Sequence, residues 1–585
     1  FADAAKDVAE LQRQSPQEPR GAYMKALLAE RDGNAAAASA ALKEVTELLD
    51  PVPVDFIRYR PQLLMLNGLA HFSLNQGEKA KQYLEAFQKV QGNSPVAKLL
   101  ARIYMSDGNP ANAATLLETY LRDHPGDGQA LTQLASANMA LGRNAKATAL
   151  MQQALKTQDN PAFRTVLGLS LVGSGQAASG ITELEAAYKK DPGQMQAGTA
   201  LVQLYLRSGQ SKKAVPVAES LVKRQPGNAA YHNLLGMALG QSGNVAGSRA
   251  AFEKAVSLDA TLVGAKLNLA RLDTATKAYD AATLRLNDIL KADARNSEAM
   301  FELALIADRK GQQTDAQRWI EKARDAAPPK DLRWGLALID FHLRYGQPGP
   351  ALEAAKVAAG KAPEDLATLM AYSRAQLANG DAAGAKTTLN GATRFAEYNA
   401  AQQVEIAQLQ LAANNPTGAA YSLDKALANR PDYLPAQALM VTVELRRGDT
   451  AKADKRAKDI AALYPKLALG HSLQGDVAMA KGQPVPAIEA YRRAHQTEPT
   501  PDTVMRLFRA LMSQPDAKPA LQLAEQWLKT QPQDLRMRKA LADGLARTGS
   551  FAQAKASYEA ALKQAPDDVE ALNNLANVQL RLKDP

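Results

Sequence analysis

The sequence contains no cysteine among its 585 residues. This absence excludes disulfide bonds, zinc–thiolate sites, iron–sulfur clusters and a catalytic thiol. Histidine is also scarce. The six histidines lie far apart, and none has a second histidine three or four positions away: His71, His124, His232, His342, His471 and His495. We therefore predict no metal site in this chain.

Charge of one sign is nowhere concentrated. Lys and Arg number 70 against 60 Asp and Glu, which gives a net charge of +10. The basic stretches are short, for example the pairs Lys189–Lys190 and Arg446–Arg447. A nucleic-acid-binding arm needs a block of about five or six like charges. We therefore expect no nucleic-acid partner. Long apolar runs are also missing, because none approaches the roughly 18 residues that span a bilayer.

Aromatic residues make up only 5% of the chain, whereas good helix formers such as Ala, Leu, Gln, Lys and Arg are abundant. The chain is too long to fold around a single hydrophobic core. An array of repeated helical units avoids this limit, because it grows by addition and needs no central core.

Glycine recurs at a fixed interval that supports such an array. Successive members of the series lie 33–35 residues apart, or twice that distance: Gly108, Gly142, Gly175, Gly209, Gly243, Gly311, Gly346, Gly380, Gly448, Gly482 and Gly549. In the doubled intervals we predict that Lys277, Asn414 and Pro515 take the place of glycine. A glycine at this period predicts the left-handed turn that ends the first helix of each unit.

Three further positions keep the same period. Alanine recurs early in the expected second helix: Ala113, Ala147, Ala214, Ala282, Ala316, Ala351, Ala385, Ala419, Ala453, Ala487, Ala520 and Ala554. A larger apolar residue is common four positions later, as at Leu117, Met151 and Tyr558. Proline closes the unit, as at Pro125 and Pro566. The small residue allows close helix contact, the large one fills the gap to the next unit, and proline stops the second helix.

This order of residues resembles the tetratricopeptide repeat (TPR), a 34-residue pair of antiparallel helices. The resemblance implies an all-α, right-handed superhelical solenoid of about 16 helix-pair repeats. We expect degenerate units over 1–93 with an irregular insert near 50–60, a continuous solenoid over 94–568, and over 569–585 the first helix of a truncated further repeat. Because a polar capping helix normally ends such an array, we expect the protein to continue beyond Pro585.

Several segments resemble one group within this superfamily, the PrsT-type TPR lipoproteins of exosortase/PEP-CTERM exopolysaccharide systems. They are residues 255–259, 265–272, 432–436, 470–476 and 566–575. The resemblance implies a periplasmic scaffold held at a membrane by a lipid on an upstream cysteine. The chain opens at Phe1 without an initiator methionine or signal peptide. We therefore expect a longer precursor that carries the anchor outside this chain.

Motifs for catalysis or cofactors are not found. The run 173–180 is glycine-rich, but its spacing differs from a dinucleotide-binding loop and a helix precedes it where a strand is required. The run 470–475 is one residue too long for a nucleophile elbow and also lies in an expected helix. There is no Walker A loop, HExxH or EF-hand motif. We therefore predict a non-enzymatic chain without a cofactor.

In such a solenoid the first helices line the concave surface, which predicts groove-facing side chains. They include Thr132, Ser136 and Thr165, and the principal candidates are Lys98, Arg102, Met105, Met139, Asn233, Met237, Arg271, Arg374, Arg509, Arg536 and Lys539. Methionine and aliphatic side chains would hold an apolar ligand face, and the arginines would hold acidic groups. The alternative is a solvated wall that binds nothing.

A carboxylate-holding site of the kind found in chaperone-binding TPRs is not expected. Asn233 and Asn268 lie at suitable positions, but the required lysines are missing and Glu298 and Glu302 would repel a carboxylate.

We expect the chain to bind proteins or peptides of an envelope polysaccharide or secretion system. The alternatives are a regulatory or substrate-binding region of a larger protein, such as a glycosyltransferase or an outer-membrane polysaccharide exporter.

Overall fold

A computed structural model describes residues 2–583 and contains 35 α-helices, with no strand in that range. Thirty-two of the helices form 16 consecutive pairs, and α1 (Ala2–Gln14), α4 (Val54–Ile57) and α35 (Val569–Leu582) stand outside them. The predicted all-α repeat architecture and the number of repeats are confirmed.

The first nine pairs are α2 (Pro19–Arg31) with α3 (Ala35–Leu49), α5 (Pro61–Ser73) with α6 (Gly77–Gln91), α7 (Val96–Ser106) with α8 (Pro110–Asp123), α9 (Gly128–Ala140) with α10 (Asn144–Thr157), α11 (Pro161–Gly173) with α12 (Ala177–Lys190), α13 (Met195–Arg207) with α14 (Ser211–Arg224), α15 (Ala229–Gln241) with α16 (Val245–Leu258), α17 (Val263–Ala275) with α18 (Tyr279–Ala292), and α19 (Ser297–Arg309) with α20 (Gln313–Ala326).

The remaining pairs are α21 (Arg333–Arg344) with α22 (Pro348–Lys361), α23 (Leu366–Ala378) with α24 (Ala382–Phe395), α25 (Ala400–Ala412) with α26 (Pro416–Asn429), α27 (Leu434–Arg446) with α28 (Thr450–Leu463), α29 (Ala468–Ala480) with α30 (Pro484–Thr497), α31 (Pro501–Met512) with α32 (Lys518–Thr530), and α33 (Leu535–Arg547) with α34 (Phe551–Gln564).

The turns within the pairs follow the predicted glycine period. Twelve contain a glycine with positive φ, and three contain Asn75, Lys277 or Asn414 in the same left-handed conformation. The prediction for Lys277 and Asn414 is therefore confirmed, but the prediction for Pro515 is wrong. Between α31 and α32 the chain uses a longer connection, residues 513–517, in which no residue has positive φ. Proline fixes φ near −65° and cannot adopt the left-handed turn.

Packing within a pair depends on the periodic alanines. All twelve alanines predicted early in the second helices have 0% exposure, and the larger residues four positions later, such as Leu117 and Met151, are also buried. A methyl group at the alanine position lets the backbones of the two helices approach closely. Helices of this length are marginal alone in water, so their stability comes from these contacts.

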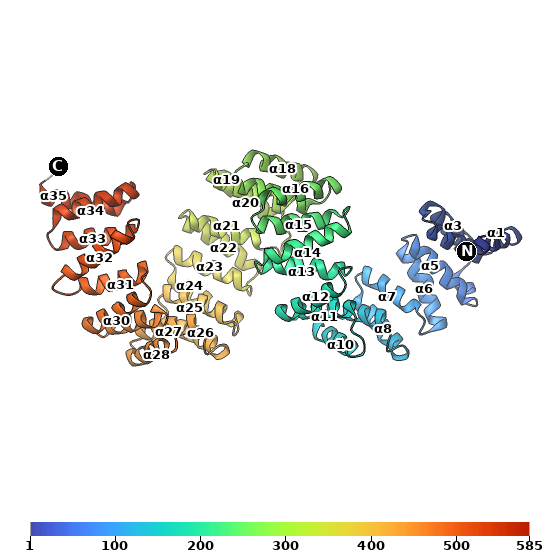
Figure 1. The fold of residues 1–585 in the computed structure, drawn as a ribbon, viewed down its shortest axis with the longest axis horizontal. Coiled ribbons are helices and arrows are strands. Elements are labelled where there is room, and N and C mark those ends of the chain that lie inside the picture. The colour runs from blue at the N-terminus through green and yellow to red at the C-terminus, as the bar shows by residue number, and fades with distance from the viewer. Residues whose placement is uncertain (1, 584–585) are drawn as a thin grey trace. The chain divides into compact units, whose positions relative to one another are not determined.

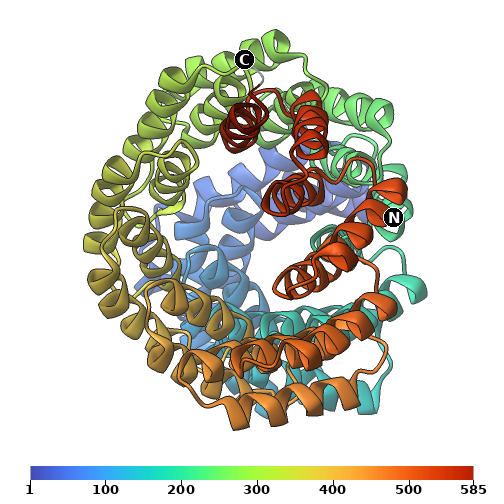
Figure 2. The ribbon, with the colours of Figure 1, turned by 90° about the vertical axis from the view of Figure 1, so that its left-hand side faces the viewer.

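The chain divides into two compact units, residues 1–289 and 290–585. Within each unit, consecutive helices lie side by side along the chain (Figures 1 and 2). The core is correspondingly a series of local clusters, each formed by neighbouring pairs. One such cluster joins Leu184 on α12 to Leu201 on α13 and Leu221 on α14. No residue in these clusters needs a partner far away in the sequence.

The predicted irregular insert contains the short helix α4. Ile57 is buried in the core cluster of α5–α7, while Phe56 and Tyr59 on the same segment are largely exposed. At the other end, α35 covers Val569–Leu582, the segment predicted as a further first helix. The boundaries predicted at residues 93 and 568 remain predictions. Among residues 2–583, no helix is long and apolar enough to cross a membrane.

Candidate functional site

The first helices of consecutive pairs in residues 1–289 line an open groove of about 440 Å³. We call it the α7–α13 groove, because its residues lie on α7, α9 and α11 and around the start of α13. They are Ala101, Arg102, Met105, Thr132, Gln133, Ser136, Ala162, Thr165, Val166, Gln194 and Gln196. Helical spacing places these side chains on one face, one turn apart on each helix.

This groove brings together several residues predicted from the sequence: Arg102, Met105, Thr132, Ser136 and Thr165. The guanidinium of Arg102 lies 5.3 Å from the centre of the Phe72 ring on α5. Sequence reasoning missed Gln133, Gln194 and Gln196. Gln133 is adjacent to Thr132, and its side chain is partly buried in the wall. Gln194 and Gln196 flank the start of α13, where positions counted from the earlier repeats do not indicate which side chains face the groove.

A second groove, of about 280 Å³, lies in residues 290–585 and is also lined by first helices. We call it the α21–α25 groove, and its wall includes the predicted Arg374. Unlike Arg102, Arg374 faces acidic neighbours: its Nη1 is 4.0 Å from Glu405 Oε1, and Asp340 lies in the same wall. With one arginine and two carboxylates in its wall, this groove carries a net charge of −1.

Two predicted lysines form ion pairs within the chain. The Lys98 Nζ is 2.8 Å from Asp127, and the Lys539 Nζ is 3.0 Å from Asp568. Both aspartates cap the next first helix, through Ala130 and Ala571 respectively. Burial alone would raise the pKa of Asp127, but hydrogen bonds from Lys98, the Ala130 N–H and Tyr120 lower it.

In the ion pair between Lys539 and Asp568, hydrogen bonds to Glu570 and Asp568 raise the pKa of Lys539. Each lysine thus connects its own first helix to the N-terminus of the next one. Their predicted role as ligand contacts stays a prediction.

Asn233, Asn268 and Arg271 form a polar ladder across α15 and α17. The Asn268 Nδ2 donates to the Asn233 Oδ1 over 3.0 Å, and the Arg271 Nη1 donates to the Asn268 Oδ1 over 3.4 Å. Met237 lies on the same first helix as Asn233 and is 39% exposed. The Asn268 amide is thus paired with the Asn233 amide, and the expectation that they form no carboxylate-holding site stays a prediction.

The other candidates occupy different environments. Met139 is half-buried and packs against the core cluster of α10 and α11, whereas Arg509 on α31 and Arg536 on α33 are exposed. The predicted set therefore does not form one surface. Arg102 and Met105 lie together in the α7–α13 groove, and Asn233 and Arg271 are joined through Asn268 on α15 and α17.

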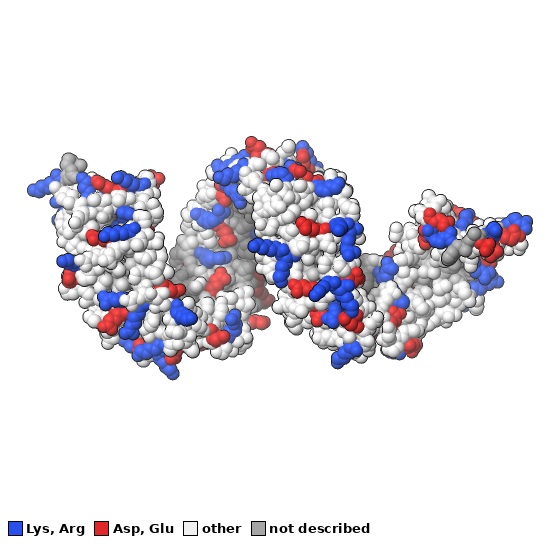
Figure 3. Space-filling view, in the orientation of Figure 1, with Lys and Arg blue, Asp and Glu red and all other residues white. Residues whose placement is uncertain are grey.

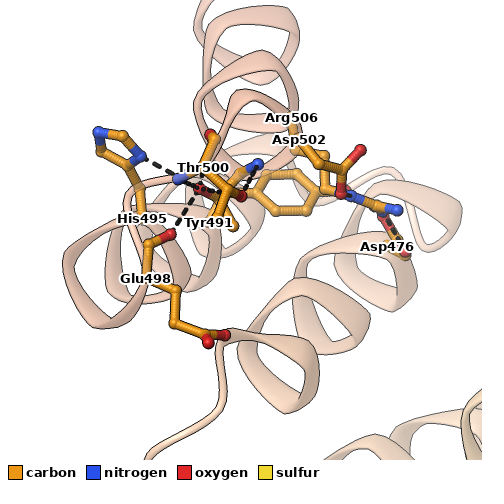
Figure 4. A network of polar contacts seen from close by, with 8 residues as sticks. Asp476, Tyr491, His495, Glu498, Thr500, Asp502 and Arg506 are labelled. Atoms are coloured by element: carbon orange, nitrogen blue, oxygen red, sulfur yellow. Dashed lines mark hydrogen bonds and ion pairs between the residues drawn. The ribbon is translucent and has the colours of Figure 1, made fainter. Parts of the chain in front are cut away.

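The densest polar cluster near the C-terminus joins α29, α30 and α31 (Figure 4). The hydroxyl of Tyr491 donates to Asp476 over 2.7 Å, and Arg506 lies 2.6 Å from the same carboxylate and 2.8 Å from Asp502. Burial and the hydrogen bond to Asp476 raise the pKa of Tyr491. Burial lowers the pKa of His495, whose Nδ1 is 3.2 Å from the Thr503 hydroxyl.

The sequence spacing indicates a structural role for this cluster. The Asp476–Tyr491 pair recurs as Asp543–Tyr558, with the same separation of 15 residues, in which the tyrosine again donates to the aspartate. A pair that repeats in this way ties the first helix to the second. The recurrent spacing was the signal that sequence reasoning overlooked.

The visible face of each unit carries Lys and Arg interspersed with Asp and Glu, separated by broad uncharged areas (Figure 3). Nowhere on that face does one sign form a continuous track of the kind that follows a nucleic-acid backbone. Within residues 2–583, no three His, Asp or Glu side chains come close enough together to hold a metal ion.

Two family models, both described as tetratricopeptide repeat, match the sequence. One matches residues 104–169, and the other matches residues 199–262 and 539–585. The sequence matches no curated protein.

Solved structures with a similar fold include a Naa15/Naa10 complex bound to HypK-THB, with a TM-score of 0.37, 16% identity, and coverage of 99% of this chain and 93% of that one. Yeast Tom70 has a TM-score of 0.35, 15% identity, and coverage of 76% and 96%. The Cut9–Hcn1 hetero-tetramer of the APC/C has a TM-score of 0.31, 15% identity, and coverage of 85% and 98%.

The matched segments fall in both units, and the helix pairs continue between them in the same period. The chain is therefore a tetratricopeptide-repeat solenoid, an architecture whose extended surfaces serve protein–protein interaction.

Proposed function

We propose that this chain is a non-catalytic scaffold that holds other proteins or peptides along its first helices. The observation that supports this proposal is the α7–α13 groove, in which side chains from consecutive repeats form one continuous wall. The wall mixes Met105, Val166 and alanines with hydroxyl and amide groups. An apolar floor with a few placed polar groups is typical of a surface that binds an extended chain.

The finer proposal places this scaffold in the Gram-negative envelope, in exopolysaccharide biosynthesis or export or in PEP-CTERM protein sorting. It also includes a periplasmic location and a lipid anchor outside this chain. This part depends on the resemblance of residues 255–259, 265–272, 432–436, 470–476 and 566–575 to the PrsT-type lipoproteins.

Site-specific photo-crosslinking in a Gram-negative envelope fraction tests both parts. The crosslinker p-benzoylphenylalanine replaces Ser136 in the groove or, as the control, the exposed Thr182 on the second helix α12. We expect adducts from position 136 that contain envelope polysaccharide or PEP-CTERM components, and few from position 182. Equal crosslinking from both positions would refute the groove, and capture of cytosolic chaperones alone would refute the envelope role.

A further inference from the structure

Arg102 is the one charged residue in the wall of the α7–α13 groove. Among the described residues no carboxylate lies within ion-pair distance of it, and its guanidinium lies 5.3 Å from the centre of the Phe72 ring. The neighbouring Lys98 is already paired with Asp127. The groove thus presents a single, solvent-exposed positive charge without an anionic partner, beside a partly apolar surface, where it can form a charge-assisted hydrogen bond with a bound anion.

The hydroxyl groups of this groove have already used their hydrogens. Ser136 donates to the Thr132 carbonyl over 2.9 Å, Thr165 donates to the Pro161 carbonyl over 2.9 Å, and Thr132 donates to the carbonyls at the start of α9. A hydroxyl has one hydrogen and two acceptor sites. Toward a ligand, the half-buried Thr132 and the exposed Ser136 therefore act as acceptors, whereas Thr165 is only 2% exposed.

Two glutamines add acceptors of the same kind. The Gln133 Oε1 is buried and has no hydrogen-bond partner within the described part of the chain. The Gln194 Nε2 donates to Asp191 over 2.8 Å, which leaves its carbonyl oxygen as the free end of the amide. An unpaired buried acceptor costs about 1–3 kcal/mol, so a ligand that brings N–H groups would recover part of that free energy.

The apolar part of the wall narrows the choice of ligand. Met105, Val166, Ala101 and Ala162 offer a surface that suits an aliphatic side chain. A nucleic acid would need several cations, and this groove has one. An extended peptide supplies backbone N–H donors at regular intervals, an apolar side chain and, where it carries Asp or Glu, the anion.

We infer that the α7–α13 groove binds an extended peptide segment that presents one acidic side chain to Arg102. Its backbone N–H groups face Thr132 and Ser136, and an adjacent apolar side chain packs on Met105 and Val166. This inference rests on the proposed scaffold function and specifies the ligand chemistry of one of its grooves. The α21–α25 groove, where Arg374 is matched by Glu405 and Asp340, has no such preference.

The test uses the full chain and three fluorescein-labelled pools of capped heptapeptides. The central residue is Glu, Gln or Lys, and the other positions are random uncharged residues. We expect the wild type to bind the Glu pool at least about tenfold more tightly than the Gln pool, since a charge-assisted hydrogen bond is stronger than a neutral one. Arg102→Gln should abolish that difference, and Arg102→Glu should transfer the preference to the Lys pool.

Arg374→Glu is the matched control, because it makes the same charge change in the other groove and should leave the order of the three pools unchanged. Circular dichroism checks that each variant is folded. The ¹³C-methyl signal of Met105, assigned with Met105→Leu, reports the location: the Glu pool should shift it in the wild type but not in Arg102→Glu.

Equal affinity for the Glu and Gln pools, or equal effects of the two charge reversals, would overturn the inference. So would no binding of any pool, or tighter binding of an acidic oligosaccharide such as trigalacturonate. If the pools fail while position 136 still crosslinks envelope proteins, the peptide inference falls and the scaffold proposal stands. If the Glu pool binds but no envelope component is captured, the peptide site stands and the envelope role falls.

Discussion

At the scale of single residues, glycine has two different uses in the helices. In α29, a β-carbon on Gly475 would lie 2.3 Å from Tyr491 Cε1, and that ring is held by its hydroxyl bond to Asp476. In α24, a β-carbon on Gly391 would meet no atom within 4 Å. The first glycine is required by packing between the paired helices, whereas the second is not.

This difference predicts opposite effects of the same substitution. Gly475→Ala should lower the free energy of unfolding by about 1–3 kcal/mol, because it overpacks a buried ring that cannot move away. Gly391→Ala should raise it by up to about 1 kcal/mol, because alanine is the better helix former. Urea denaturation followed by tryptophan fluorescence measures both changes. A Gly475→Ala protein as stable as the wild type would show that the ring relaxes.

Asp50 is a single carboxylate that joins three helices. It accepts hydrogen bonds from Asn67 and His71 on α5 and from Lys79 and Tyr83 on α6, and it ends α3. Burial alone would raise its pKa, but the bonds from Lys79, Asn67 and His71 lower it from 3.8 to about 2.

This shift predicts an acid-dependent loss of stability. Because the folded pKa lies below the unfolded one, the stabilisation is fully present above about pH 4 and is lost as the pH falls toward 2. Asp50→Asn should therefore cost about 2 kcal/mol at pH 7 and almost nothing at pH 2. Hydrogen exchange in α3, α5 and α6 across this pH range measures the effect. A variant whose deficit is the same at both ends would contradict the assignment.

At the scale of elements, the sequence predicts most of the turns between paired helices but not all of them. The glycine period predicts all twelve helix pairs between α7 and α30, because one backbone conformation recurs in each. The alanine period marks ten of them, and Gly180 and Ser248 stand at that position in α12 and α16. The α31–α32 connection could not be predicted from the period, since Pro515 cannot form the left-handed turn and extra residues bridge the gap. Lys277 is the opposite case, a side chain that adopts the turn at φ 63°.

Lys277→Gly should therefore raise the free energy of unfolding. The left-handed conformation costs a non-glycine residue about 1–2 kcal/mol. The greater conformational entropy of glycine in the unfolded chain lowers the gain in stability by about 0.5–1 kcal/mol. A net gain between about 0 and about 1.5 kcal/mol follows from these two terms. The control is Asn379→Gly, at a helix end with φ −86°, where glycine relieves no strain and should destabilise. Thermal denaturation by circular dichroism compares them; a loss in both variants would disprove the strain argument.

The candidate site was predictable only in part, because the repeat period indicates the position of a side chain but not its hydrogen-bond partners. The position within the first helix indicates that a side chain faces the groove, which placed Arg102 and Met105 in it. It does not indicate which groups are already paired. Lys98 and Lys539 each meet an aspartate 29 residues later, a spacing visible in the sequence. The unpaired Gln133 oxygen, by contrast, depends on side-chain rotation, which no periodic pattern contains.

At the scale of the whole molecule, stability should be a sum of local terms, because the core clusters join neighbouring pairs. The three tryptophans, Trp319, Trp334 and Trp527, all lie in the second unit, residues 290–585. Tryptophan fluorescence therefore reports the unfolding of that unit alone, while circular dichroism reports both. The two probes should give different urea transitions for the full chain, and coincident transitions would indicate one cooperative structure.

Two truncations test the same argument with the fluorescence signal. A fragment that begins at Asn296, the N-cap residue of α19, keeps every pair that contains a tryptophan and should unfold with the midpoint of the full chain. A fragment that begins at Gln313 removes α19, whose residues Phe301 and Ala304 pack with Trp319 and Ile320. It should unfold at lower urea, with Trp319 emission shifted to longer wavelength. If both fragments lose stability equally, the pair of helices is not the unit of stability in this chain.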